Sequence, residues 1–585
     1  MRASEYILNH FKEEGVKYAF GITGGVIAPM MDAFDPSKNL ELICTAQEQG
    51  ATTAAEAYSR ITQNLGVALS TSGPGAINLL NGVGCAYFDS IPIVCITGQV
   101  NPNESTWEGG PRQLGFQETD IVRMVEPLTK YAVRVDDPKT IRYELEKSIY
   151  LARSGRPGPV LLDLPFNTQM AEMDEQDLRP YDVPRKEVDY DLLDQKVNQT
   201  IDLIRSAERP VLILGAGVKI GRAQKRTRDL IERLEIPVIP SWGAMDVLPH
   251  NNPLFVGGFG VSHGRAGNFA VQNSDLMISL GSRLDTRQTG AKRETFARGA
   301  KKVVLDVDTG ELYKGKGMVV DVALPYDIND FLDSIEKKDL PTRDISEWKE
   351  RINTWKEKYT ICLPEYFNQE DKVNPYVFMD ALSDESKEGD IIIPDTGGTL
   401  TWTMQGWKVK EGQRLFSAFG HSPMGYAPQA AIGASLASGK GPVTCIVGDG
   451  GLKMGIHELE TIVRHCLPVK TFIINNHEYG IIKGFQDGLF ESRYKATCFE
   501  GGLGNADLLK IAEAYGTPTL QINNHREMRD KIREVLNYEG PIVCSVELKH
   551  GEKIMPKAGF GKPIEDSVPL LPREEFNENM IVPPI

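Results

Sequence analysis

Short apolar runs alternate with amphipathic, helical stretches along most of the chain. The first set comprises "KYAFGI", "LELICT", "GVALSTS", "PIVCITG" and "GPVLLDLP". Runs of this length, bounded by glycine and proline, are typical of parallel strands that are buried on both faces. The same alternation starts again at "RPVLILGAG" and a third time at "DIIIPDTGG". The pattern predicts an α/β protein with three doubly wound parallel-sheet domains.

Polar stretches mark the expected domain boundaries. The segment "AEMDEQDLRPYDVPRKEVDYD" is rich in charge and proline, and residues 336–373 are charged and helical, so both are expected to be connections. We therefore expect domains at residues 1–180, 190–340 and 370–550. The tail, residues 551–585, has prolines and few periodic apolar positions, and we expect it to wrap over another part of the molecule.

Composition narrows the class of protein. The 585 residues are 41% hydrophobic and 25% charged, which is a globular profile. The net charge of −15 argues against nucleic acid or an anionic membrane surface as the main partner. No apolar run approaches the roughly 20 residues that span a bilayer. The eight cysteines form no CxxC pair, and Cys44, Cys95 and Cys445 lie in apolar runs, so free buried thiols and a cytoplasmic location are expected.

The third segment carries the most specific motif, "CIVGDGGLKMGIHELETIVRHCLPVKTFIINN". Asp449 and Asn476 stand at the carboxyl ends of two consecutive predicted strands, where a doubly wound sheet binds its ligands. A carboxylate, a carboxamide oxygen and a backbone carbonyl near Glu478 are hard ligands that suit Mg²⁺ bridging to a diphosphate. Gly450 and Gly451 let backbone amides approach that diphosphate.

Glu48, in "TAQEQGATTAAEAYSR", stands at a strand-to-helix joint among small residues. One interpretation is that its carboxylate offsets the positive end of the helix dipole. The other is a catalytic carboxyl group, and the residues of this stretch alone do not decide between the two.

The motifs together resemble a known family. "EQGATTAAEAYSR", "STSGPGAINLL", "GFQETD", "SGRPGPVLLDLP", "LGSRLDTRQTG" and the GDG–NN segment resemble the large, catalytic subunits of acetohydroxyacid (acetolactate) synthases, which are thiamine diphosphate enzymes. The resemblance covers about residues 1 to 550. It implies an N-terminal pyrimidine-binding domain, a central FAD-binding domain and a C-terminal diphosphate- and Mg²⁺-binding domain.

The resemblance implies roles for individual residues. Glu48 of one subunit would hydrogen-bond the aminopyrimidine of a cofactor held by its neighbour, which implies a homodimer or homotetramer with active sites between subunits. Met424 would wedge under the thiazolium ring, although a core methionine is a serious alternative. Further thiamine diphosphate contacts carried over are Gly24, Gly25, Gly398, Thr399, Ser422, Gly450 and Gly451. The resemblance leaves open whether a small regulatory subunit binds.

"VLILGAGVKIG" alone is a loose dinucleotide fingerprint that often marks only a tight strand–helix turn. The resemblance adds FAD as a cofactor and assigns to it Gly215, Gly217, His263, Gly264, Arg283 and Asp306. It implies no net redox role for that flavin.

The substrate site is where the sequence departs from the family. Arg287 matches the arginine that holds the carboxylate of a second 2-oxoacid, and Gln117 matches an active-site glutamine. Phe485 replaces a tryptophan, and the stretch "STWEGGPRQLGFQ" is longer than expected. His421 is unusual in its loop and is either an acid–base or substrate contact or a surface histidine.

The implied reaction is decarboxylation of pyruvate and addition of the hydroxyethyl carbanion to a second carbonyl, most simply giving 2-acetolactate. Acetyl transfer to an aldehyde or keto-sugar and a flavin-dependent pyruvate oxidase are the alternatives. Glu48, Asp449 and Asn476 argue against a catalytically inactive paralogue, and the Asp449–Asn476 pair argues against an NAD dehydrogenase.

Overall fold

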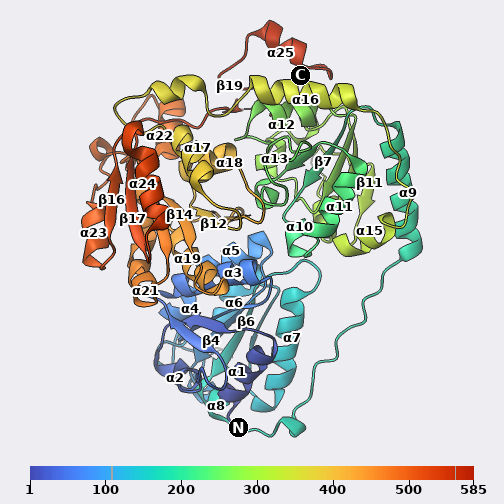
Figure 1. Cartoon of the computed structure of the whole chain (residues 1–585). Helices are drawn as coiled ribbons and strands as arrows, with labels where there is room; N and C mark the ends of the chain where they lie inside the picture. The colour runs from blue at the N-terminus through green and yellow to red at the C-terminus, as the bar shows by residue number, and fades with distance from the viewer. Residues whose placement is uncertain (107–109, 316, 560) are drawn as a thin grey trace.

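The computed structural model contains three parallel sheets, one in each domain, and describes residues 1–106, 110–315, 317–559 and 561–585. The N-terminal domain lies below the other two in Figure 1, and the central and C-terminal domains lie side by side above it. All pairings within the three large sheets are parallel, which confirms the predicted fold class.

The N-terminal sheet has the strand order β2-β1-β3-β4-β6-β5. Its strands are β1 (Tyr18–Gly21), β2 (Glu41–Cys44), β3 (Gly66–Ser70), β4 (Ile93–Gln99), β5 (Tyr131–Arg134) and β6 (Val160–Pro165). Its helices are α1 (Ala3–Glu13), α2 (Ala28–Asp32), α3 (Glu48–Thr62), α4 (Pro74–Asn78), α5 (Leu80–Asp89), α6 (Ile121–Val125), α7 (Ile141–Arg153) and α8 (Phe166–Met170).

The central sheet has the order β11-β10-β9-β7-β8. Its strands are β7 (Pro210–Leu214), β8 (Val238–Pro240), β9 (Leu276–Leu280), β10 (Lys301–Leu305) and β11 (Val322–Leu324). The helices of this part are α9 (Tyr190–Ser206), α10 (Gly217–Ile220), α11 (Gln224–Leu234), α12 (Arg265–Gln272), α13 (Thr286–Thr289), α14 (Thr309–Leu312), α15 (Ile328–Ile335) and α16 (Ser346–Lys358).

The C-terminal sheet has the order β13-β12-β14-β15-β17-β16. Its strands are β12 (Ile391–Pro394), β13 (Arg414–Leu415), β14 (Val443–Gly448), β15 (Val469–Asn475), β16 (Thr519–Ile522) and β17 (Ile542–Glu547). Its helices are α17 (Pro375–Glu385), α18 (Gly398–Gly406), α19 (Tyr426–Ala437), α20 (Asp449–Gly455), α21 (Leu459–Arg464), α22 (Gly480–Leu489), α23 (Leu508–Ala514) and α24 (His525–Asn537). Numbered from its own first strand, this sheet has the same order as the N-terminal one, so the two domains share one topology.

Helices α3 and α19 join these two domains. Both helices are rich in alanine, and a side chain on Gly433 would come within 1.8 Å of the Ala54 carbonyl oxygen. The small residues therefore let the two backbones pack closely. Buried polar groups also connect the helices, because the Tyr426 hydroxyl donates a 2.7 Å hydrogen bond to Glu56, which also accepts from Arg60.

The tail packs along the central domain. It carries a short antiparallel pair, β18 (Lys557–Ala558) with β19 (Ser567–Val568), and a final helix α25 (Arg573–Asn579) that lies beside α16 at the top of Figure 1. Four buried polar side chains of α12 and the residue after it, Arg265, Asn268, Gln272 and Asn273, hydrogen-bond the tail. Ile564 and Phe576 complete the hydrophobic core of this face.

Residues 171–189 run along the outside of the molecule with a single short turn of helix, Glu175–Asp177 (Figure 1). No helix among the described residues is long and apolar enough to cross a membrane.

The structure corrects one prediction about the cysteines. Cys95 and Cys445 are buried and free as expected, but Cys44 is exposed. The reason is that β2 is the edge strand of its sheet, so its apolar run is not covered on both faces.

Candidate functional site

Three oxygen atoms converge at the carboxyl ends of β14 and β15. The side-chain oxygen of Asn476 faces the Glu478 carbonyl oxygen at 2.9 Å and Asp449 Oδ1 at 3.2 Å, and turning the amide over would make both contacts hydrogen bonds. Asp449 Oδ2 is buried and has no hydrogen-bond partner in the described part of the chain. Burial raises the pKa of the Asp449 carboxyl. A cation at this point would satisfy all these oxygens, so the residues fit an Mg²⁺ site.

The predicted metal site relies on one carboxylate supported by neutral oxygens. The described residues contain no group of three His, Cys, Asp or Glu side chains that could hold a metal ion. The side chain of Glu478 points elsewhere, because it accepts a 2.8 Å hydrogen bond from the Gly551 amide. Only its carbonyl is therefore a candidate ligand.

Glycines line the space beside this site. Gly397 has φ of +83°, which favours glycine, and it begins the helix that carries Gly398 and Thr399. A side chain on Gly450 would meet Tyr479 at 2.2 Å and Met424 Cε at 3.0 Å. Met424 therefore lies next to the diphosphate motif rather than in a separate core.

Asp395 supports the Met424 loop and was missed in the sequence. It lies at the end of β12, accepts hydrogen bonds from the Gly425 and Ala427 amides at 3.0 and 3.1 Å, and burial raises its pKa to about 6. Ser422 adopts φ of +55°, and its hydroxyl lies 2.6 Å from that of Thr396. The sequence signal for this support is the aspartate of "DTGG", which directly follows an apolar run.

A second group forms on the N-terminal domain. Glu48 is the first residue of α3, and its carboxylate accepts a 3.0 Å hydrogen bond from Asn78. Its other oxygen would be 3.2 Å from a side chain on Gly75. Gln117 packs against Gly73, two residues before Gly75. Glu48 and Gln117 therefore lie on either side of the Gly73–Gly75 loop. Gly24 lies against Thr71 on that side of the sheet, followed by Gly25.

The described residues contain no hydrogen bond or ion pair between Glu48 and the group around Met424 and Asp449 within one chain. His421 stacks on Phe88 of the N-terminal domain with ring centroids 5.6 Å apart, and it is exposed. Phe485 lies on α22 and is 51% exposed. The stretch expected to shape the acceptor site includes residues 107–109, which lie outside the described residues.

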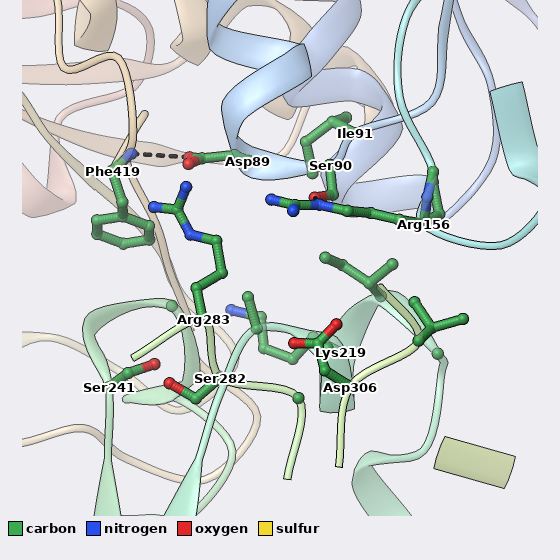
Figure 2. Close-up of a pocket in the computed structure, with 18 of the residues that line it drawn as sticks. Asp89, Ser90, Ile91, Arg156, Lys219, Ser241, Ser282, Arg283, Asp306 and Phe419 are labelled. Atoms are coloured by element: carbon green, nitrogen blue, oxygen red, sulfur yellow. Dashed lines mark hydrogen bonds between the residues drawn. The ribbon is translucent and has the colours of Figure 1, made fainter. Parts of the chain in front are cut away.

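A cavity of about 430 Å³ lies where the three domains meet (Figure 2). Gly217, His263, Arg283, Asp306 and Arg287 line it, so the structure brings together five residues that the sequence assigned to flavin or substrate. Gly215 and Gly264 are not among the lining residues. Gly215 instead packs on the Gly281 carbonyl, and Gly264 precedes α12 and faces Ile361.

The cavity is strongly cationic, and several of its groups have perturbed acidity. Burial lowers the pKa of His263 to about 3 and that of Lys219 to about 8, and it raises the pKa of Asp306 to about 6. The Arg287 guanidinium lies 5.2 Å from the centre of the Trp242 ring. The size and charge of the cavity suit an anionic ligand as large as a nucleotide.

Arg156 was also missed, although it stands in the quoted motif "SGRPGPVLLDLP". It reaches into the cavity from the N-terminal domain, opposite Arg283 of the central domain (Figure 2). Its guanidinium bonds Ser90, Asp308 and Glu311 at 2.8 to 3.0 Å. The sequence placed Arg156 near the end of the first domain and gave no sign that this turn meets the central domain.

Family models match all three domains. The models described as the N-terminal TPP binding domain, the central domain and the C-terminal TPP binding domain of thiamine pyrophosphate enzymes match residues 1–124, 197–335 and 395–546. Thiamine pyrophosphate is another name for thiamine diphosphate, so the matches support this cofactor.

Relatives match nearly the whole chain. The acetolactate synthase large subunit of Pyropia yezoensis is 32% identical, with 95% of this chain and 93% of the relative covered. That of Lactococcus lactis subsp. lactis (strain IL1403) is 29% identical, with 98% and 97% covered. The acetolactate synthase isozyme 1 large subunit of Escherichia coli (strain K12) is 31% identical, with 94% and 95% covered. The chain therefore belongs to the thiamine pyrophosphate enzymes, in the family of acetolactate synthase large subunits.

Proposed function

We propose that the protein is a thiamine diphosphate- and Mg²⁺-dependent carboligase that decarboxylates pyruvate and joins the remaining two-carbon unit to a second pyruvate, giving 2-acetolactate. The observation that carries this proposal is the oxygen cluster of Asp449, Asn476 and the Glu478 carbonyl beside Gly450 and Met424. The family membership of the whole chain supports the same reaction.

When bound, thiamine diphosphate supplies a nucleophilic carbon and an electron sink for the decarboxylation. Asp449, Asn476 and the Glu478 carbonyl would hold the Mg²⁺, while the amides near Gly450 and Gly451 approach the diphosphate. Met424 would pack against the ring of the cofactor. Glu48 would hold a proton at the aminopyrimidine N1′, and Gln117, which packs against the same loop, would orient a substrate.

We propose a dimer as the smallest active unit, since the described part of one chain shows no hydrogen bond or ion pair between Glu48 and the group around Met424. Exposed apolar side chains lie near both groups and would be covered by a second copy. Next to Asn78 and Gln117 in the sequence they are Ile77 and Phe116, and on α20 and α22 they are Met454, Ile481, Ile482 and Phe485.

We propose that the cavity between the three domains holds FAD. Gly217, Arg283 and Asp306 line it, and its cations suit a diphosphate. Arg287, which lies over Trp242 at one side of the cavity, is proposed to hold the carboxylate of the second pyruvate. The eight free cysteines fit a reducing, cytoplasmic location.

The test is product analysis with the purified protein, thiamine diphosphate, Mg²⁺, FAD and pyruvate, with and without aldehyde or keto-sugar acceptors. Acetolactate as the main product from pyruvate alone supports the proposal. Acetyl phosphate with oxygen uptake would instead identify an oxidase, and a product formed only with an added acceptor would identify a different transferase. Adding a small regulatory subunit of a relative to the same assay tests for that partner.

A further inference from the structure

A buried carboxylate of the C-terminal domain holds the backbone immediately before Glu48. Glu458 ends a short helical turn, Ile456–Glu458, and is fully buried. Its Oε2 accepts a 3.2 Å hydrogen bond from the Ala46 amide, and its Oε1 accepts one of the same length from the Gln47 amide. The Thr461 hydroxyl donates a 2.7 Å hydrogen bond to Glu458 Oε2, so a residue of the C-terminal domain also holds the carboxylate in place.

These contacts lie at the beginning of α3. The first amides of a helix have no partner within it, and Gln47, which precedes the helix, provides no side-chain cap. Glu458 instead accepts from the two amides that immediately precede the helix, those of Ala46 and Gln47, and it lies more than 400 positions away in the sequence. Glu48 is the next residue of the chain, so the direction of its side chain depends on how the backbone of Ala46 and Gln47 is held.

Gly50 leaves room for this contact. A side chain at this position would lie 2.0 Å from Glu458 Oε1, closer than any atom could approach. The glycine of "EQGA" therefore has a defined purpose: it lets the carboxylate reach the beginning of the helix. Neither a role of Glu48 in the helix dipole nor a cap from the N-terminal domain would require a glycine at position 50.

We propose that Glu458 is a positioning residue for Glu48, which links the C-terminal domain of each chain to the cofactor-activating carboxyl group of the same chain. The inference rests on the proposed function, in which Glu48 serves the cofactor held by the neighbouring chain. The segment from Asp449 to Glu458 begins at a metal ligand of one active site and ends at the support for the activating group of the other. It therefore connects the two sites of a dimer.

The first experiment compares Glu458→Gln with the parent by hydrogen–deuterium exchange at C2 of bound thiamine diphosphate, at saturating cofactor and Mg²⁺. Glutamine replaces one acceptor with a donor that faces a backbone amide, so Glu48 shifts. We expect exchange about 10- to 100-fold slower, since misplacement by about 1 Å costs up to 10²-fold. Glu460→Gln, an exposed change on the following helix, should exchange at the parent rate.

A purely structural role predicts a different result. Glu458→Gln would then lower the thermal midpoint or the cofactor affinity, but the folded, saturated protein would exchange at the parent rate, and that outcome overturns the proposal. If Glu458→Gln does not fold, Thr461→Val provides a milder change through the same carboxylate. Loss of its one hydrogen bond should slow exchange about 2- to 10-fold, and an unchanged rate again overturns the proposal.

Mixed dimers separate this inference from the proposed function. A chain with Asp449→Ala paired with a chain carrying Glu48→Gln retains one complete site, with Glu48 from the first chain and the metal ligands from the second. Glu458→Gln added to the first chain should slow exchange, and added to the second chain it should not. Equal effects in both chains would contradict the positioning role. If the mixed dimer without Glu458→Gln shows no recovered exchange, the two-chain site is wrong, while the single-variant comparison still decides the role of Glu458.

Discussion

At the scale of single residues, the Glu48 carboxylate is placed to serve either the helix or the chemistry. It stands at the beginning of α3, where a carboxylate offsets the helix dipole, and it also hydrogen-bonds Asn78 beside the Gly73–Gly75 loop. A carboxylate needed only for the dipole would be replaceable by glutamine at a cost below about 1 kcal/mol. The two roles therefore make different predictions for one substitution.

Glu48→Gln should keep the fold, because glutamine is nearly isosteric, and should slow C2 exchange on bound thiamine diphosphate by about 10²- to 10⁴-fold. The measurement is acid-quenched exchange read by NMR, which isolates proton transfer from the acceptor chemistry. Glu13→Gln, on the exposed side of α1, is the matched control. A rate for Glu48→Gln within a few-fold of the parent would leave only the dipole role.

Residues within local motifs could be predicted from the sequence, and residues that act across domains could not. Asp449 and Asn476 follow buried strands, and parallel strands bring their carboxyl ends to one edge, so their meeting follows from local pattern. Glu458 and Arg156 acquire their roles from contacts with residues 152 to 412 positions away. No local pattern contains that information.

Small residues determine how α3 and α19 pack at the scale of elements. Gly433→Ala would place a methyl group 1.8 Å from the Ala54 carbonyl oxygen, so the helices would have to separate. Such overpacking costs about 1 to 3 kcal/mol. We expect a lower thermal midpoint in calorimetry.

Gly406→Ala is the matched control, because Gly406 lies at the end of α18 and a methyl group there would come no closer than 3.4 Å to Met379 Cβ. Alanine should be neutral or stabilising there, by up to about 1 kcal/mol of helix propensity. Equal losses from both substitutions would show that the α3–α19 contact is not close.

Strand β6 carries a buried carboxyl group that makes stability depend on pH. Asp163 is fully buried, accepts hydrogen bonds from Thr97 and Gln99 at 2.7 and 3.0 Å, and burial raises its pKa to about 7. The folded protein therefore binds a proton that the unfolded chain has already released above about pH 4. The contribution of Asp163 to the free energy of unfolding is therefore largest below pH 4, and it is lost as the pH rises to about 7.

Asp163→Asn should remove this dependence, since the amide can donate to Thr97 and accept from Gln99. The stability of the variant relative to the parent should rise between pH 4 and pH 7, by at most about 4 kcal/mol. Urea unfolding of both proteins at pH 5 and pH 8 measures this difference in the free energy of unfolding. A constant difference between the two proteins across that range would mean that Asp163 is ionised in the folded state throughout.

Elements were predicted well where both faces of a strand are buried, because an uninterrupted apolar run is then a strong signal. Edge strands gave weaker signals: β2 exposes Cys44, and β13 is only two residues long. The shared strand order of the first and third sheets could not be read from the sequence, since no repeat is visible there. Many different sequences can pack into the same strand order, so two sheets can share it without a visible sequence repeat.

The cavity between the three domains depends on the whole molecule, because Arg156 and Arg283 enter it from different domains (Figure 2). Arg156→Ala removes a cation and leaves Asp308 and Glu311 without that partner. We expect FAD affinity to fall about 10- to 150-fold, the loss of roughly 1.5 to 3 kcal/mol for a charged contact. Fluorescence titration with FAD measures it without any assay of turnover.

Arg205→Ala is the control for the flavin titration, since Arg205 lies on the exposed side of α9. The parent protein itself should bind FAD with a visible absorbance band. A parent that ignores FAD would exclude flavin from this cavity, and unchanged affinity in Arg156→Ala would exclude this arginine from the binding site.

The docking of the tail on α12 sets an order of events during synthesis. Ile335 ends the last helix of the central α/β unit, but Phe576, which completes its core, is 241 residues further on. At about 5 to 20 residues per second, the ribosome needs roughly 10 to 50 s to reach it. During that interval the nascent central domain presents Asn268, Gln272 and their apolar neighbours to the solvent. Chaperones therefore have a defined window in which to protect this face, and a stalled ribosome would prolong it.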